Sequence, residues 1–364
     1  MRAIHAAVTL STVLAAGSAA QQVKDLSALL APIRREHDVP ALGVAVLEDG
    51  ALAALGVDGV RKVGDPTEVT ERDLWHLGSC TKAMTATWLA MLVDDGDLNW
   101  DTTVAEALPD LAASMHPAAR GVSLVSLLQH RAGVSASPPA PLWKRLIRYD
   151  GSDREARIEV ARALLTAPPA GAPGVHFLYS NAGYMVAGAV GESVAGSGWQ
   201  QQMRQRLFEP LGMSRAGFGP PGDEAAVDHP WGHLVQNGER RPMFFDNPPS
   251  MGPAGTVHAS LRDWAKFAAL HLQRATDEAV LSARSRQRLR TPPQAGSYAC
   301  GWMVTERRWA PGPVLTHTGS NTLWFCVAWL APEAGFGVLV TCNQGGAAAA
   351  CDAVAAACVR RFRG

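Results

Sequence analysis

Apolar residues near the start of the chain recur first at helical and then at strand spacing. Residues 23–38 carry apolar side chains at the i, i+3, i+4 and i+7 positions of an amphipathic helix: Leu26, Leu29, Leu30 and Ile33. Residues 41–59 are largely apolar on both sides of the turn sequence at 48–50, Glu-Asp-Gly, which is typical of a β-hairpin. The pattern predicts a helix followed by a hairpin at the start of the fold.

Helical spacing dominates the middle of the chain. A helix is predicted over residues 79–95, and Gly96 ends it. Capping boxes at residues 152–155 and 260–263 predict the starts of two further helices. Proline-rich segments between the elements are interpreted as loops, at residues 138–141, 168–173, 220–221 and 248–253.

After Gly301 the pattern returns to short apolar runs that are typical of strands. These runs cover residues 314–317, 323–330 and 336–341, and an alanine-rich helix follows them to Arg361. Segments that form strands therefore lie at both ends of the chain and flank a helical middle.

This order of elements predicts an α+β fold, an α/β sandwich. The economical arrangement pairs the N-terminal hairpin with the C-terminal strands in one antiparallel sheet, which the terminal helices cover. Residues 21–96 and 251–364 then form an α/β lobe, and residues 97–250 form a mainly helical lobe. We expect the functional site in the cleft between the lobes.

The first 20 residues match the template of a secretory signal peptide. Arg2 precedes a run rich in Ala, Val and Leu, and small residues at positions 17–20 provide a cleavage site. No other segment reaches the roughly 18 apolar residues needed to span a bilayer. We expect residues 21–364 to form a secreted or periplasmic protein without stable membrane insertion.

Composition indicates a globular protein that acts on small molecules. Of the 364 residues 47% are hydrophobic, and 33 Lys and Arg balance 33 Asp and Glu to a formal net charge of +0. Without excess positive charge the chain has no electrostatic field that would attract nucleic acid, so nucleic-acid binding is excluded. The six cysteines lack the spacing of a disulfide scaffold, although the sequence is compatible with one bridge.

A serine stands three residues before a lysine in the sequence GSCTK. If the helix starts at Ser79, Lys82 lies on the same face, where Cβ atoms at i and i+3 are about 5–6 Å apart. A serine hydroxyl needs an adjacent base to act as a nucleophile, and a lysine can serve once burial disfavours its charged form. The alternative interpretation is a helix-capping serine beside a solvated lysine.

Two later motifs place polar groups at the ends of predicted elements. In FLYSNAGY, Tyr179 and Asn181 stand two residues apart just before a helix. In VLTHTGSN, His317, Thr318 and Gly319 end a strand, and the glycine would let a substrate backbone lie close against the strand edge.

Ser-x-x-Lys, Tyr-x-Asn and His-x-Gly in this order resemble the serine β-lactamase and penicillin-binding protein superfamily, particularly its class C β-lactamase, D-peptidase and esterase branch. Four further segments look like framework segments of that family, at residues 98–111, 127–134, 208–213 and 253–260. The resemblance implies a DD-peptidase/β-lactamase-like fold and a hydrolase that transfers acyl groups without a metal or an organic cofactor.

The resemblance also assigns the catalytic roles. Ser79 is the acylated nucleophile, and Lys82 and Tyr179 share proton transfer. A tyrosine acts as a base near neutral pH only if a neighbouring cation favours its ionised form, and Lys82 is the candidate cation.

The remaining motif residues would bind the substrate. Asn181 bonds the substrate amide, and His317, Thr318 and Gly319 form the strand motif against which the substrate lies. The backbone N–H groups of the nucleophile and of Ser320 form the oxyanion hole.

The substrate class depends on the strand motif. In the family a lysine there suits substrates with a carboxylate beside the scissile bond, whereas this chain has His317, and a histidine is charged in only a minority of molecules at pH 7. The KM for a carboxylate substrate is therefore expected to rise between about pH 5.5 and 8. We favour a D-peptidase or esterase acting on a small-molecule or peptide acyl substrate. The alternatives are a class C-like β-lactamase and a penicillin-recognising binding or sensor domain that deacylates slowly.

Other histidines are weaker candidates. His229 and His233 have a four-residue spacing, but Pro230 and Gly232 oppose a helical ligand pair, so we predict no zinc site. His130 is interpreted as a residue that fixes its loop.

Overall fold

The computed structural model of the chain describes residues 22–272 and 278–364. The expected signal peptide, residues 1–20, lies outside the described residues. Within those residues, no helix is both long enough and apolar enough to cross a membrane.

A seven-stranded sheet joins the two ends of the chain, in the order β1-β3-β2-β12-β11-β10-β9. The N-terminal hairpin pairs with the last strand through β2 and β12, where Val44 lies opposite Val340. The strands are β1 (Lys24–Asp25), β2 (Ala41–Glu48), β3 (Ala51–Gly59), β9 (Met303–Thr305), β10 (Val314–Gly319), β11 (Phe325–Ala331) and β12 (Phe336–Cys342). The predicted α+β class is confirmed. The sheet is antiparallel except at β1, which runs parallel to β3 and was not predicted.

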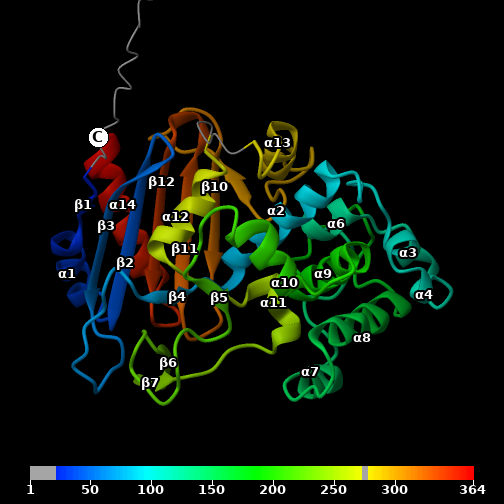
Figure 1. Ribbon diagram of the computed structural model, residues 1–364, viewed down its shortest axis with the longest axis horizontal. Coiled ribbons are helices and arrows are strands. Elements are labelled where there is room, and N and C mark those ends of the chain that lie inside the picture. The colour runs from blue at the N-terminus through cyan, green and yellow to red at the C-terminus, as the bar shows by residue number, and fades with distance from the viewer. Residues whose placement is uncertain (1–21, 273–277) are drawn as a thin grey trace, which may run out of the picture.

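Helices cover both faces of this sheet. Along β2, Val44 and Val46 pack into one apolar cluster with α1 (Ser27–Glu36) and α14 (Ala348–Arg363), whereas Ala45 and Leu47 belong to a second cluster with α12 (Leu261–Ala269). Successive side chains of a strand point to opposite faces, so β2 is apolar throughout because both of its faces are buried. Figure 1 shows α1 and α14 on one side of the sheet, and the helical part of the chain on the other side, beyond α2.

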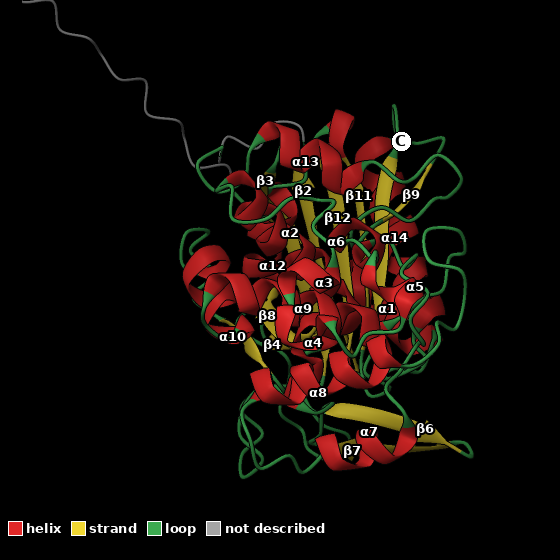
Figure 2. Ribbon diagram, turned by 90° about the vertical axis from the view of Figure 1, so that its right-hand side faces the viewer, coloured by secondary structure: helices red, strands yellow, loops and turns green. Residues whose placement is uncertain are grey.

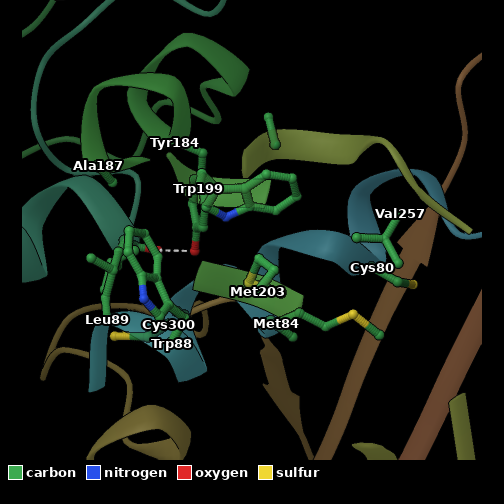
Figure 3. Close-up of a cluster of buried hydrophobic side chains, with 14 of the residues drawn as sticks. Cys80, Met84, Trp88, Leu89, Tyr184, Ala187, Trp199, Met203, Val257 and Cys300 are labelled. Carbon is green, nitrogen blue, oxygen red and sulfur yellow. Dashed lines mark hydrogen bonds between the residues drawn. The ribbon is translucent and has the colours of Figure 1, made fainter. Parts of the chain in front are cut away.

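The central helix α2 (Thr81–Asp94) is buried on all sides. Every residue from 81 to 92 is buried, so α2 has no solvent-exposed face before its last turn. Met84, Trp88 and Leu89 belong to the same buried cluster as Tyr184 of α9 (Asn181–Ala195), and Figure 3 shows these residues. The 3-10 turn η1 (Gly78–Cys80) directly precedes α2, so the first turn of a rigid helix presents Ser79 and Lys82.

Most of the remaining helices lie in the middle of the chain. They are α3 (Val104–Ala107), α4 (Pro109–Ala112), α5 (Pro117–Arg120), α6 (Leu124–Leu128), α7 (Ala140–Leu146), α8 (Asp153–Thr166), α10 (Trp199–Gln202), the π-helix η2 (Met203–Phe208), η3 (Pro249–Met251), α11 (Gly252–Gly255), α13 (Ala283–Arg290) and η4 (Pro332–Ala334). The capping box predicted at Ser152 and Glu155 starts α8, and Ser260 caps α12 by accepting a hydrogen bond from the Asp263 backbone.

Two small sheets were not predicted from the sequence. One contains β4 (Leu74–His76), β8 (Val257–Ser260) and β5 (Ala216–Phe218), and the other is the hairpin of β6 (Gly232–Gln236) and β7 (Glu239–Met243). Figures 1 and 2 both place this hairpin at the lower end of the molecule. The strands of three to five residues are too short for an alternating pattern to distinguish them from loops. All six cysteines are free and buried, so the structure contains no bridge between them.

Candidate active site

Ser79 and Lys82 meet at the start of α2. The Lys82 Nζ lies 2.9 Å from the Ser79 Oγ, because the two residues are one helical turn apart. The structure thus places serine and lysine as their spacing led us to expect. Lys82 is fully buried and is not a solvated surface cation.

Burial changes the chemistry of Lys82. It lowers the pKa of the amine to about 7, because the charged form loses its hydration. The Nζ also lies 2.7 Å from the Asn181 Oδ1 and 2.6 Å from the Ala254 carbonyl, and both of these oxygens only accept hydrogen bonds. A neutral amine donates its two protons to them and keeps its lone pair for the Ser79 hydroxyl. This arrangement allows Lys82 to take the serine proton.

Tyr179 lies beside the same pair. Its ring is 4.9 Å from the Lys82 Nζ, and burial raises the pKa of the phenol well above its ordinary value, against a smaller opposing effect of its hydrogen bond with Ser79. The sequence suggested that Lys82 would stabilise an ionised tyrosine, but burial raises the pKa of the phenol instead. Tyr179 is therefore a neutral phenol that can donate a proton, which leaves Lys82 as the base.

His130 supports the segment that carries Tyr179. The two rings are 4.3 Å apart between centroids, and the His130 Nδ1 accepts a hydrogen bond from the Ser180 backbone N–H at 3.1 Å. Burial holds the pKa of His130 at about 2, so the ring is neutral. The Ser180 hydroxyl in turn caps α9 at the Gly183 N–H, so the interpretation of His130 as a residue that fixes its loop fits these contacts.

The end of β10 packs directly against the turn that holds the nucleophile. A Cβ on Gly78 would lie 2.3 Å from the Ser320 N, and a Cβ on Gly319 would lie 2.0 Å from the Leu77 carbonyl oxygen. Gly78 also has φ +45°, a conformation that side chains disfavour. Both glycines are thus required for the contact that brings the backbone of Ser320 to the start of α2. Gly319 meets the protein's own backbone here, whereas the sequence suggested a substrate backbone.

Both ring nitrogens of His317 have partners within the chain. The Nδ1 lies 2.6 Å from the Thr318 carbonyl, which can only accept, so the Nδ1 carries a proton. The Nε2 lies 2.9 Å from the Tyr298 hydroxyl, which can donate to it. A neutral His317, 6% exposed, therefore satisfies all its hydrogen bonds. The sequence did not single out Tyr298, because it lies in a loop that matches none of the three motifs.

These residues surround one cavity of about 480 Å³. Its lining brings together Ser79, Tyr179, His317, Thr318, Gly319 and Ser320 with the apolar Phe177, Tyr298, Met303 and Phe325. Lys82 and Asn181 lie behind the nucleophile and do not line the cavity. Phe177 is 48% exposed and Met303 39%, so the mouth of the cavity is apolar. No lysine, arginine, aspartate or glutamate from the described part of the chain lines it.

Comparisons with known proteins match most of the chain. The Beta-lactamase family profile matches residues 23–359. Penicillin-binding protein 4 of Amycolatopsis lactamdurans is 30% identical over 332 residues, which are 86% of this chain and 83% of that protein.

Two solved structures share the fold. A crystal structure of SurE with D-Leu is 26% identical, has a TM-score of 0.71, and aligns over 90% of this chain and 73% of that one. A class C β-lactamase from Rhodobacter sphaeroides is 20% identical, has a TM-score of 0.74, and aligns over 92% of this chain and 97% of that one. The second likeness concerns the fold alone.

Proposed function

Because the chain belongs to the β-lactamase family, as its three motifs predict, we propose that it hydrolyses acyl substrates through an acyl-enzyme on Ser79. The observation that carries the proposal is the 2.9 Å approach of the buried Lys82 Nζ to the Ser79 hydroxyl, with a lysine pKa of about 7. A serine beside a partly neutral amine is an activated nucleophile at neutral pH.

The proposed reaction has two halves. Lys82 takes the Ser79 proton as the hydroxyl oxygen attacks the substrate carbonyl, and the backbone N–H groups of Ser79 and Ser320 stabilise the oxyanion. The proton then passes by way of Lys82 and the neutral Tyr179 to the leaving group, which departs and leaves an ester on Ser79. Water hydrolyses this ester and restores the hydroxyl.

We further propose that the substrates have no charged group beside the scissile bond and that they carry an apolar group. The apolar mouth and the absence of charged lining side chains among the described residues support this, as does the hydrogen bonding that a neutral His317 satisfies. Esters, and D-peptides whose scissile bond has no neighbouring carboxylate, fit these conditions. The likeness to the structure of SurE with D-Leu supports a substrate that contains a D-residue.

Intact-protein mass spectrometry tests the proposed function. The protein is mixed with p-nitrophenyl acetate and, separately, with a fluorescent penicillin. Steady release of p-nitrophenol with a transient mass increase on Ser79 supports a hydrolase. Steady turnover of the penicillin would indicate a β-lactamase instead, and a lasting penicillin adduct without turnover of either compound would indicate a sensor. No adduct on Ser79 with either compound or with a fluorophosphonate would refute all three.

The strand motif gives a prediction about pH. Since both ring nitrogens of His317 already bond within the chain, neither is free to bind a substrate carboxylate, and we expect parallel KM profiles between about pH 5.5 and 8 for two matched esters, one neutral and one with a free carboxylate. His317→Lys should lower KM for the carboxylate ester relative to the neutral one by about five-fold, equivalent to about 1 kcal/mol for a partly solvated charge pair. A KM that rises with pH for the carboxylate ester alone would show that a charged histidine binds it.

Export is a separate proposal, supported by the signal-like pattern of residues 1–20. Expression without these residues should give an active protein, because the family match begins only at residue 23. N-terminal sequencing of the protein from its native host should find a start near residue 21. A mature chain that retains its first residues would contradict export by cleavage.

A further inference from the structure

A buried carboxylate connects the two backbone segments that meet at the nucleophile. Asp246 lies between β7 and η3, and its side chain is only 3% exposed. Its Oδ2 lies 2.8 Å from the His76 Nε2, and its Oδ1 lies 3.0 Å from the Asn321 Nδ2. One carboxylate thus holds two side chains that are far apart in sequence.

The two partners of Asp246 flank the proposed oxyanion hole. His76 is the last residue of β4, three positions before the nucleophile, and Asn321 directly follows Ser320. Both are largely buried, with His76 at 0% and Asn321 at 8% exposure. Asp246 therefore ties together the segments that contain the Ser79 and Ser320 N–H groups.

Contacts outside this group fix the direction of the hydrogen bonds that His76 and Asn321 make with Asp246. The His76 Nδ1 accepts from the Gly78 N–H at 3.1 Å, so its Nε2 must carry the proton that faces Asp246. The Asn321 Oδ1 accepts from the Leu323 N–H at 3.2 Å, so its NH₂ group must face Asp246. Both partners can only donate. The position between them therefore requires two acceptor oxygens, which a carboxylate has and an amide lacks.

We propose that Asp246 is a positioning residue for the oxyanion hole. It fixes the distance between the Ser79 and Ser320 N–H groups through His76 and Asn321, without touching the substrate. The Gly78 N–H bond to His76 transmits the position of the carboxylate to the residue before the nucleophile. The inference rests on the proposed function, since the hole acts only if Ser79 is acylated.

Asp246→Asn is the direct test. The NH₂ group of the new asparagine would face either the His76 Nε2–H or the Asn321 NH₂. Neither of these donors can turn an acceptor toward it without losing its own bond from a backbone N–H. Loss of one oxyanion-hole donor typically costs about 10²–10³-fold in rate, so partial misplacement should slow acylation by about 30-fold or more. Two rates are measured: labelling of Ser79 by a fluorophosphonate, and kcat for p-nitrophenyl acetate. Both should fall together while KM changes less than about three-fold, because the hole stabilises charge that appears only in the transition state.

Two further variants provide the controls. Asp228→Asn alters a carboxylate that accepts an exposed backbone N–H in the connection between β5 and β6, and it should react like the wild type. Asp246→Glu keeps two acceptor oxygens and should recover part of the lost rate. If Asp246 had only a structural role, Asp246→Asn would lower the melting temperature, but the labelling rate of the folded protein would stay within about three-fold of wild type. That result would overturn the inference.

Asn321→Ala decides the question if Asp246→Asn does not fold. It removes the bond on the Ser320 side only, so the inference requires labelling at least about ten-fold slower, and an unchanged rate overturns it. If a variant with both Asp246→Asn and Asn321→Ala folds, the two reductions in labelling rate should not add, because both substitutions break the same connection. A wild-type protein that fluorophosphonate does not label would instead refute the proposed function.

Discussion

Replacing Ser79 with alanine should abolish acyl-enzyme formation while the protein stays folded. The variant lacks the only atom that the proposed reaction acylates, so turnover of p-nitrophenyl acetate should fall by at least about 10⁴-fold. The Ser79 hydroxyl does not cap a helix, and its bond to Lys82 contributes about 1 kcal/mol to the free energy of unfolding. The melting temperature should therefore change by only a few degrees.

Fluorophosphonate labelling followed by peptide mapping measures this loss directly. Ser214→Ala, which alters an exposed serine outside the cavity, is the matched control and should keep wild-type labelling. Residual labelling of Ser79→Ala at another serine, at the wild-type rate, would show that the nucleophile is misassigned.

Replacing Lys82 with methionine should lower the acylation rate by about 10²–10⁴-fold, the range that a general base contributes. Methionine fills the buried space of the lysine stem, which avoids the cavity that alanine would leave. It leaves the Asn181 and Ala254 oxygens without their donor, so some loss of stability accompanies the loss of rate. Stopped-flow measurement of the p-nitrophenol burst gives the acylation rate separately from the loss of stability.

The pH profile of the wild type identifies the base. With a lysine pKa of about 7, the amine is protonated and inactive below that pH and free above it. The acylation rate for a neutral ester should therefore rise through about pH 7 and then level off. In Lys82→Met the residual rate should lack this step. A step that survives in the variant would assign the base to another group.

Much of the fold could be predicted from the spacing of apolar residues in the sequence. The hairpin β2–β3, the strands β10 to β12 and the helix α14 appear where apolar residues alternate or recur at helical spacing. Pairing of the two chain ends also follows, because strands at both ends need partners and a buried face. The sequence missed β1, β4, β5, β8, β9 and the hairpin β6–β7, whose strands are too short to leave a pattern.

The sequence by itself also determined the contact between Ser79 and Lys82, because residues three apart on a helix are neighbours whatever the rest of the chain does. Only the tertiary structure decided the protonation of Tyr179 and the hydrogen bonds of His317, since both depend on burial and on residues from other elements. Asp246 lies 170 positions from His76 and 75 from Asn321. Its role is invisible in sequence because the direction of each bond is set by backbone N–H groups that come together only when the sheet edge packs against the start of α2.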